Sequence, residues 1–361
     1  MIPLIVDLET EWRGGQNQAL LLLKGLYERG HAAELLVAHG SALGQRAKKE
    51  GIYVHSVSRA VFRLGAARKI RSLLGDGRIE LVHVNEAHAL TAAWMGLPKG
   101  GPPLVVSRRV GFPLKQSWLS QARYRRADAI LANSHWVAEQ AAASGAPKEK
   151  LRVVYEGVEI AERPSAAARA EARQKWGFGE RDILLGCVGA LEKDKGHEWV
   201  IRALAEIRPE FPNSKLLIAG EGEYREALTA LAKELGCENS VIIAGFVKQI
   251  SAVYEAIDIF VFPSLFEGLG TSLLSAMSHG VPSITFFGCA LGEIVENGVS
   301  GIQVEARNSS AIAEAARLIL GDGALRERLG EAGHRRIKEE FSADKMVDNT
   351  LAVYEELLGK Y

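Results

Sequence analysis

Short apolar segments alternate with longer amphipathic segments along most of the chain, and this alternation constrains the fold more than any other feature. Ile2–Leu8 and Ile183–Val188 have the length of buried strands, and Gln16–Arg29 carries apolar residues at helical spacing. Strands that alternate with helices form parallel sheets covered by helices. Because the series runs through twice, we predict an α/β protein with two doubly wound, Rossmann-like domains.

The two series are separated near residues 162–181 by a stretch that is rich in Ala, Arg and Glu and has no strand character. A length of 361 residues also fits two domains of about 100–200 residues each. We therefore predict one domain over 1–162 and a second over 163–341. We expect the final helix, within 342–361, to pack back on the first domain.

The composition excludes several classes of protein. The chain has 44 basic and 44 acidic residues, so as a whole it is not a polyanion binder, and we expect no nucleic-acid partner. No apolar run approaches the roughly 20 residues that cross a bilayer. The N-terminus lacks a signal-peptide pattern, and the three widely spaced cysteines suit neither a disulfide scaffold nor a zinc site. We expect a cytoplasmic protein.

Charge is divided unevenly along the chain. Residues 1–160 contain 22 basic and 14 acidic residues, and the remainder has the opposite excess. The basic residues are densest over 59–126, with 13 basic and 3 acidic residues. Three interpretations fit this segment: a surface that rests on anionic lipid, a site for an anionic acceptor, or an ordinary solvated surface.

Two glycine-containing turns follow predicted strands. Gly14 and Gly15 lie between the first strand and a helix, and Gly189 ends a strand whose following loop carries Lys195 at the next helix start. Backbone amides at a helix N-terminus bind anions, and a lysine pairs with phosphate as a point charge. A tight turn without a ligand explains the Gly14-Gly15 pattern equally well, and by itself a lysine in this kind of loop is more often only solvated. The spacing is not G-x-G-x-x-G, which disfavours a nicotinamide or flavin dinucleotide.

The strongest local motif follows the predicted strand Ile259–Val261. Glu267 comes just before Gly268-Leu269-Gly270, and a helix is expected from Thr271. A carboxylate accepts hydrogen bonds from hydroxyl groups, and exposed backbone amides donate to an anion. The motif therefore indicates a ligand with hydroxyl and phosphate groups, and a glutamate that only caps a glycine turn is the alternative.

The segment from Pro263 to Pro282 resembles the donor-site motif of retaining glycosyltransferases of family 4, which have the GT-B architecture. Further segments are similar to the phosphate-binding loop, the nucleotide pocket, the first-strand loop and one subgroup's acceptor-side loop: Val188–His197, Ala219–Gly222, Gly245–Val247, Gly14-Gly15 and Val106–Pro113. These segments occur in the family's order over most of the chain. The resemblance therefore implies a GT-B fold with a cleft between two domains.

The same resemblance implies a metal-independent hexosyltransferase without a cofactor. It would move a sugar, with retention, from a UDP- or GDP-sugar to an envelope glycan, lipid-linked sugar or similar acceptor, in peripheral contact with the inner face of an anionic membrane. The catalytic residues that it implies are Glu267, Lys195 and His88, and the implied acceptor contacts are Arg108 and Arg109. The implied donor-binding residues are Gly14, Gly15, Gly189, Lys195, Gly222, Phe246, Val247, Glu267, Gly268, Leu269, Gly270, Thr271 and Ser275.

Three positions depart from the family's pattern. Ser275 replaces the second acid of an E-x7-E pair, Ala190 replaces an arginine, and Cys289-Ala290 replaces a pair of glycines, although Glu293 remains. The resemblance implies that the missing acid holds the ribose and that the missing arginine helps to neutralise the diphosphate. These losses leave two alternatives to a transferase: a non-catalytic binding protein with this fold, and a sugar-nucleotide epimerase of the same architecture.

Overall fold

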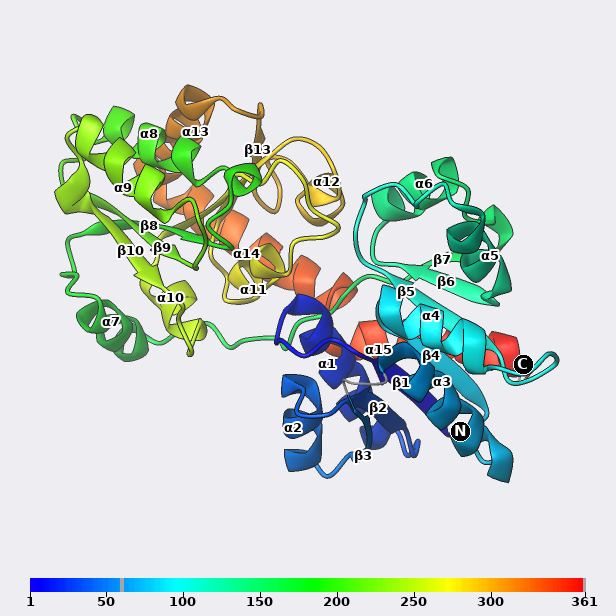
Figure 1. The fold of residues 1–361 in the computed structure, drawn as a ribbon. Helices are drawn as coiled ribbons and strands as arrows, with labels where there is room; N and C mark the ends of the chain where they lie inside the picture. Colours follow the sequence, from blue (N-terminus) through cyan, green and yellow to red (C-terminus); the bar gives the residue numbers. More distant parts are fainter. Residues whose placement is uncertain (59–61, 360–361) are drawn as a thin grey trace. The chain divides into compact units, whose positions relative to one another are not determined.

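The computed structural model describes residues 1–58 and 62–359. It divides into two compact units, Met1–Gly157 together with the C-terminal segment from Ala343, and Val158–Ser342. The boundary therefore falls a few residues before the predicted one at 162/163. Both units are α/β, as the alternation of segments predicts, and in each the helices cover the two faces of a central sheet (Figure 1).

The first unit has a seven-stranded parallel sheet in the order β3-β2-β1-β4-β5-β6-β7. Its strands are β1 (Pro3–Asp7), β2 (Glu34–Ala38), β3 (Tyr53–Val57), β4 (Leu81–Val84), β5 (Leu104–Arg108), β6 (Ala129–Ala132) and β7 (Leu151–Val153). Its helices are α1 (Gly14–Glu28), α2 (Ala42–Lys49), α3 (Phe62–Leu73), α4 (Ala87–Gly96), α5 (Trp118–Arg126), α6 (His135–Ala143) and the C-terminal α15 (Ala343–Leu358).

The second unit has a six-stranded parallel sheet in the order β10-β9-β8-β11-β12-β13. Its strands are β8 (Ile183–Val188), β9 (Ser214–Ala219), β10 (Val241–Gly245), β11 (Ile259–Phe262), β12 (Ser283–Phe286) and β13 (Ile302–Val304). Its helices are α7 (Ala166–Lys175), α8 (His197–Ile207), α9 (Arg225–Glu234), α10 (Ser251–Ala256), α11 (Thr271–Ser278), α12 (Leu291–Ile294), α13 (Ser309–Gly321) and α14 (Gly323–Glu340).

Helix α15 closes the core of the first unit. Val347, Leu351 and Tyr354 are buried in one cluster with apolar residues of α1 and the sheet. The hydroxyl group of Tyr354 also hydrogen-bonds the buried His83 of β4 at 2.5 Å. The last segment of the chain is therefore an integral part of the N-terminal unit.

In each sheet the strand order reverses at one place, between β1 and β4 and between β8 and β11. In doubly wound sheets, ligands bind outside the carboxyl ends of the strands at this switch point. Residues that directly follow these four strands are therefore the first candidates for a site. No helix in the described part of the chain is both long and apolar enough to cross a membrane.

The strand Tyr53–Val57 has no counterpart among the predicted elements. It lies at the edge of its sheet, and only Val57 is buried among its five residues. An edge strand of this kind has no continuous apolar run, so its sequence resembles a loop. Helix α1 also begins earlier than predicted, with Gly14 and Gly15 as its first two residues.

Candidate functional site

An ion pair between Lys195 and Glu267 lies at the switch point of the second sheet. Lys195 ends a short 3-10 helix (Lys193–Lys195) in the loop after β8, and Glu267 lies in the loop after β11. The Nζ atom of Lys195 lies 3.0 Å from Oε1 of Glu267, and about one fifth of each side chain is exposed (21% and 18%). The pair therefore stands at the surface, with both groups open to a ligand.

The surroundings of Lys195 keep it charged. Burial alone lowers the pKa of this lysine, but the carboxylates of Glu267, Asp194 and Glu192 outweigh burial, and the net result is a raised pKa. Lys195 also donates to the carbonyl oxygen of Phe266 at 3.4 Å. The ammonium group is thus a positive charge held in a fixed position.

Close backbone contact explains why the two loops meet. Gly196 has a φ of +69°, and a Cβ there would collide with the carbonyl oxygen of Pro263 at the end of β11. The amide of Leu265 donates to the carbonyl oxygen of Asp194 at 2.8 Å. A residue with a side chain at 196 would therefore push Lys195 away from Glu267.

Two other glycines bring the loop after β9 against the loop after β8. A Cβ on Gly220 would collide with the carbonyl oxygen of Gly189, and a Cβ on Gly222 with that of Leu191. Phe246, just after β10, presents 74% of its surface to solvent. Gly189, Gly222 and Phe246 thus follow three neighbouring strands, at the same edge of the sheet as the Lys195–Glu267 pair.

His197 lies beneath this loop and is a residue to which sequence reasoning gave no role. Its Nε2 donates to the carbonyl oxygen of Ala190 at 3.0 Å, and its Nδ1 lies 3.0 Å from Sγ of Cys187. Burial is the main cause of its lowered pKa. The neutral ring therefore holds the loop after β8 in place and carries no charge of its own.

The segment after Glu267 presents the N-terminus of α11. Gly270 adopts a φ of +107° and packs beside Phe262, while Leu269 is buried and anchors the turn. Thr271 is the first residue of α11. The first amides of a helix have no intrahelical acceptor and carry a partial positive charge. The predicted residues Gly268 to Thr271 therefore form one turn at the start of α11, next to Lys195.

Ser275 and Cys289, two of the unusual positions, both lie near this turn. The hydroxyl group of Ser275 donates to the carbonyl oxygen of Thr271 at 3.0 Å and also hydrogen-bonds the buried Tyr254. Burial raises the pKa of the Cys289 thiol, which accepts a hydrogen bond from the Glu267 backbone. The hydroxyl group of Ser275 is thus engaged by its own fold.

In the first unit, Gly14 and Gly15 lie at the N-terminus of α1, close to the end of β1. Nδ2 of Asn85 donates to Oδ2 of Asp7 at 2.5 Å and to the carbonyl oxygen of Gly15 at 3.1 Å. Gln16 also donates to Asp7, and burial raises the pKa of this carboxyl. Asp7 and Asn85 were not predicted. They fix the position of the glycine turn.

His88 lies in the first turn of α4, which Glu86 caps through the amides of His88 and Ala89. Nε of Arg63 donates to Nδ1 of His88 at 3.1 Å, so Nδ1 is an acceptor. Burial, followed by the charge of Arg63, lowers the pKa of His88. Its side chain is 38% exposed, and Nε2 lies 3.9 Å from Glu9. His88 is thus a neutral group with Nε2–H available.

Oxygen and nitrogen atoms of Glu9, Glu86 and His88 lie within 4.8 Å of one another, a spacing that suits metal ligands. Two features of this cluster disfavour a cation. Glu86 already accepts hydrogen bonds from backbone amides, and the guanidinium group of Arg63 donates to Nδ1 of His88. Glu86 and His88 are therefore already engaged by other groups of the protein.

Arg108 and Arg109 differ in their surroundings. Nε of Arg109 pairs with Glu156 at 2.9 Å, and its Nη1 donates to the carbonyl oxygen of Asn85 at 3.0 Å. Arg108 donates to the carbonyl oxygen of Phe112. Arg109 is therefore tied into the same network as Gly15, whereas Arg108 stabilises the loop after β5.

Two family models match the chain, one in each half. The model of "Glycosyl transferases group 1" matches residues 168–336, and that of "Glycosyltransferase Family 4" matches residues 12–162. Together they span the greater part of both units.

Relatives agree with these matches. An uncharacterized glycosyltransferase of Methanocaldococcus jannaschii is 32% identical over 59% of this chain and 57% of its own length. A mannosyltransferase of Mycolicibacterium smegmatis, named as GDP-mannose-dependent and as acting on phosphatidylinositol monomannoside, is 29% identical over 74% of each chain.

Solved structures share the fold. HepE of Anabaena, in complex with UDP and glucose, is 20% identical with a TM-score of 0.82, covering 97% of this chain and 98% of its own. A glycosyltransferase of Rickettsia africae is 18% identical with a TM-score of 0.86, covering 100% and 99%. The predicted GT-B fold class is confirmed, and the two family models together show that the chain belongs to the family 4 type of glycosyltransferases.

Proposed function

We propose that this glycosyltransferase moves a hexose from a UDP- or GDP-sugar, with retention and without a metal ion. The observation that carries the proposal is the Lys195–Glu267 pair beside the first turn of α11. At one edge of the second sheet it brings together a positive charge, a carboxylate and helix amides that have no intrahelical acceptor. These are the groups that a diphosphate and a hydroxylated sugar require together.

In this proposal each group has a separate task. The ammonium group of Lys195 and the amides of Gly270 and Thr271 stabilise the negative charge that develops on the leaving diphosphate. Glu267 accepts hydrogen bonds from sugar hydroxyl groups and tolerates positive charge at the anomeric carbon. The leaving phosphate takes the proton of the acceptor hydroxyl on the same face, so retention needs no protein nucleophile. His88 and the Gly14-Gly15 turn contribute the contacts of the first unit.

The names of the relatives support a nucleotide-sugar donor of either base. The mycobacterial relatives are named as GDP-mannose-dependent, and HepE has been solved with UDP-glucose. The second unit of this chain offers a phosphate-binding edge that does not depend on the base. We therefore propose a nucleoside diphosphate sugar with either uracil or guanine as its base.

We propose a glycan or lipid-linked acceptor, reached in peripheral contact with an anionic membrane. The first unit exposes large apolar side chains among its basic residues: Leu64 is 62%, Phe112 60% and Trp118 76% exposed. Arg59, the first residue of the basic segment, lies outside the described residues. Two other basic residues of the segment make contacts within the unit: Arg71 donates to the carbonyl oxygen of Gly96, and Arg123 donates to Thr91. Both partners are neutral, so these contacts leave the charge of the arginines in place.

Incubation of the protein with UDP-glucose and GDP-mannose separately, without acceptor and with a chelator present, tests the reaction class. Slow release of free nucleoside diphosphate and sugar supports a transferase. An altered sugar nucleotide would show an epimerase, and binding without any turnover would show a non-catalytic protein. Lys193→Ala is the matched control for Lys195→Ala, since Lys193 is an exposed lysine of the same 3-10 helix.

A further inference from the structure

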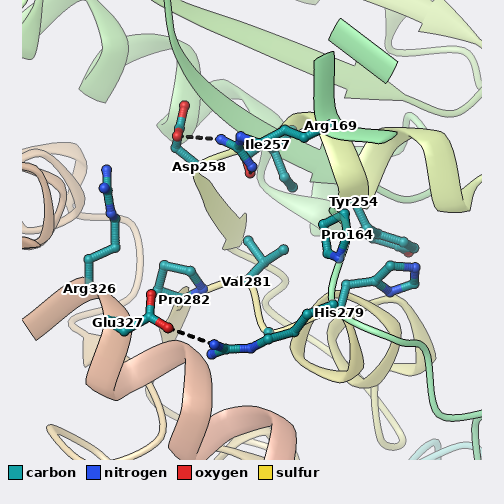
Figure 2. A pocket seen from close by; sticks show the side chains of 12 residues that line it. Pro164, Arg169, Tyr254, Ile257, Asp258, His279, Val281, Pro282, Arg326 and Glu327 are labelled. Carbon is teal, nitrogen blue, oxygen red and sulfur yellow. Dashed lines mark hydrogen bonds and ion pairs between the residues drawn. The ribbon is translucent and has the colours of Figure 1, made fainter. Parts of the chain in front are cut away.

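A polar pocket with a volume of about 310 Å³ lies at the edge of the second sheet opposite to the Lys195–Glu267 pair (Figure 2). Ile257 and Asp258 directly precede β11, and Val281 and Pro282 directly precede β12. Because the strands are parallel, their amino ends lie at the edge away from Lys195 and Glu267. Helix α11 separates the two places: Thr271 begins it beside Glu267, and His279 follows its end at the pocket. Eight residues of helix span about 12 Å.

Three arginines from different parts of the chain line the pocket: Arg163 before α7, Arg169 in α7 and Arg326 in α14. Figure 2 shows Arg326 on one side of the pocket and Pro164, Tyr254 and His279 on the other. Asp258 and Glu327 are the acidic residues of the lining. The lining therefore carries one more positive than negative charge.

Arg169 is held in place by an ion pair and by a hydrogen bond to the backbone. Nη2 of Arg169 pairs with Oδ1 of Asp258 at 2.5 Å, and its Nη1 donates to the carbonyl oxygen of Ile257 at 3.0 Å. The other oxygen of Asp258 pairs with Arg173 at 2.6 Å. The single negative charge of Asp258 is thus shared by two guanidinium groups, so Arg169 and Arg173 together keep a net positive charge. Burial, together with the charges of Arg173 and Arg326, lowers the pKa of Arg169 despite Asp258.

Arg163 packs against Gly280, where a larger residue would not fit. A Cβ on Gly280, which has a φ of +73°, would lie 2.7 Å from Nε of Arg163, and a Cβ on Gly330 would collide with the carbonyl oxygen of Gly280. Nη1 of Arg163 pairs with Oε1 of Glu327 at 2.6 Å. Arg326 differs, because within residues 1–58 and 62–359 no ion pair or hydrogen bond engages its guanidinium group. It is exposed beside the pocket with its donors available.

The pocket also offers hydrogen-bond acceptors. Nδ1 of His279 donates to the carbonyl oxygen of Ser275 at 2.7 Å, so the neutral ring has Nε2 as an acceptor. Burial is the main cause of the lowered pKa of His279, which favours this neutral form. A ligand that suits the pocket would place an anionic group on the arginines and hydroxyl groups on His279 and Glu327.

We propose that this pocket binds a small phosphate-bearing molecule with hydroxyl groups, such as a sugar phosphate, separately from the donor site. Arg326 and Arg163 hold the phosphate, and Arg169 adds its charge. The volume lies at the lower end of the range for small-molecule sites, which suits a single phosphorylated sugar and is too small for a large ligand.

Calorimetric titration of the full chain with ribose 5-phosphate tests the proposal, with ribose as the uncharged control. We expect ribose 5-phosphate to bind and ribose not to bind. Arg326→Ala should weaken binding at least tenfold, equivalent to about 1.4 kcal/mol. Arg328→Ala, which removes the same charge from α14 outside the pocket lining, should change binding less than twofold. Glu327→Gln should tighten binding, because it removes a negative charge from the lining and the shorter of the two ion pairs of Arg163, with Glu327 and Glu331.

Lys195→Ala separates this pocket from the donor site. The proposal expects it to leave the binding of ribose 5-phosphate within twofold of the wild-type value. If affinity falls in Lys195→Ala and not in Arg326→Ala, the ligand binds at the donor site and the proposal is wrong. Absence of binding to the wild-type protein at millimolar ligand would also overturn it. Neither result bears on donor hydrolysis, which is measured without a sugar phosphate.

Discussion

The Nζ atom of Lys195 lies 3.0 Å from Oε1 of Glu267, although 72 positions separate the two residues in the sequence. One residue follows β8 and the other follows β11, and these strands are neighbours at the switch point of their sheet. The pair therefore exists because of strand order, and it sets a positive and a negative group side by side at the candidate donor site.

Lys195→Ala should reduce transfer at least tenfold at saturating donor and acceptor. Hydrogen bonds to charged groups contribute about 1.5–3 kcal/mol, which corresponds to a factor of ten or more. The fold should survive, since loss of a partly exposed ion pair costs about 1 kcal/mol and lowers Tm by roughly 2–4 °C. Lys193→Ala should retain full turnover. Equal turnover of wild type and Lys195→Ala would remove this lysine from the mechanism.

Glu267→Gln should lower turnover much more than affinity for the free nucleoside diphosphate. The carboxylate is assigned to hydroxyl groups of the donor sugar, and the free nucleotide lacks that sugar. The neutral amide also leaves Lys195 without its partner, which should favour the diphosphate. Parallel measurement of kcat and of nucleotide Kd checks this assignment. A loss of affinity as large as the loss of turnover would contradict it.

Ser275 should make the donor site tolerant of a missing ribose hydroxyl. Its hydroxyl group already donates to Thr271 and contacts Tyr254, so it has little capacity left for a ligand. We expect a 2′-deoxynucleoside diphosphate to bind within about fivefold of the ribose form, a difference below roughly 1 kcal/mol. Calorimetry with both ligands tests this, and Ser275→Glu should increase the preference for ribose. A wild-type preference above about thirtyfold would show that another residue binds the ribose.

His83 should make the fold sensitive to acid. Burial, followed by the charge of Arg109, lowers its pKa from 6.5 to about 3. Between these two values the unfolded chain binds a proton that the folded chain does not. This group therefore has no effect above pH 6.5, and its contribution to the free energy of unfolding is lost by about 1.4 kcal/mol per unit as the pH falls toward 3.

Urea unfolding at pH 7, 6 and 5 measures this dependence. In His83→Gln the free energy of unfolding should fall less steeply with decreasing pH than in wild type, whatever its value at pH 7. His39→Gln, at an exposed position, should keep the wild-type slope. Identical slopes in wild type and His83→Gln would show that His83 is protonated in the folded protein.

The first unit should bind weakly to anionic vesicles and dissociate at high salt. Each basic residue near such a surface contributes about 1 kcal/mol, and screening acts beyond roughly 8–10 Å. Trp118→Ala should weaken sedimentation with phosphatidylserine vesicles, because this ring is 76% exposed. Tyr53→Ala removes an exposed ring outside the basic segment and serves as the control. Equal partitioning onto neutral and anionic vesicles at low salt would contradict the proposal.

Much of the fold is predictable from local sequence. Strand β8 has the predicted bounds Ile183–Val188, and helix α11 begins at Thr271 as expected. These features depend on residues within one or two turns. The edge strand Tyr53–Val57 was missed because its exposed residues lack an apolar run.

The sequence by itself determined the family, the α/β alternation and the residues that follow each strand, because glycine turns, caps and apolar runs are local signals. Only the tertiary structure decided which of those residues meet. It paired Lys195 with Glu267, tied Arg109 to Glu156, turned Ser275 toward Tyr254 and gathered Arg163, Arg169 and Arg326 around one pocket. The physical reason is that such contacts join residues tens to hundreds of positions apart, and strand order and helix packing, not local sequence, bring them within hydrogen-bond distance.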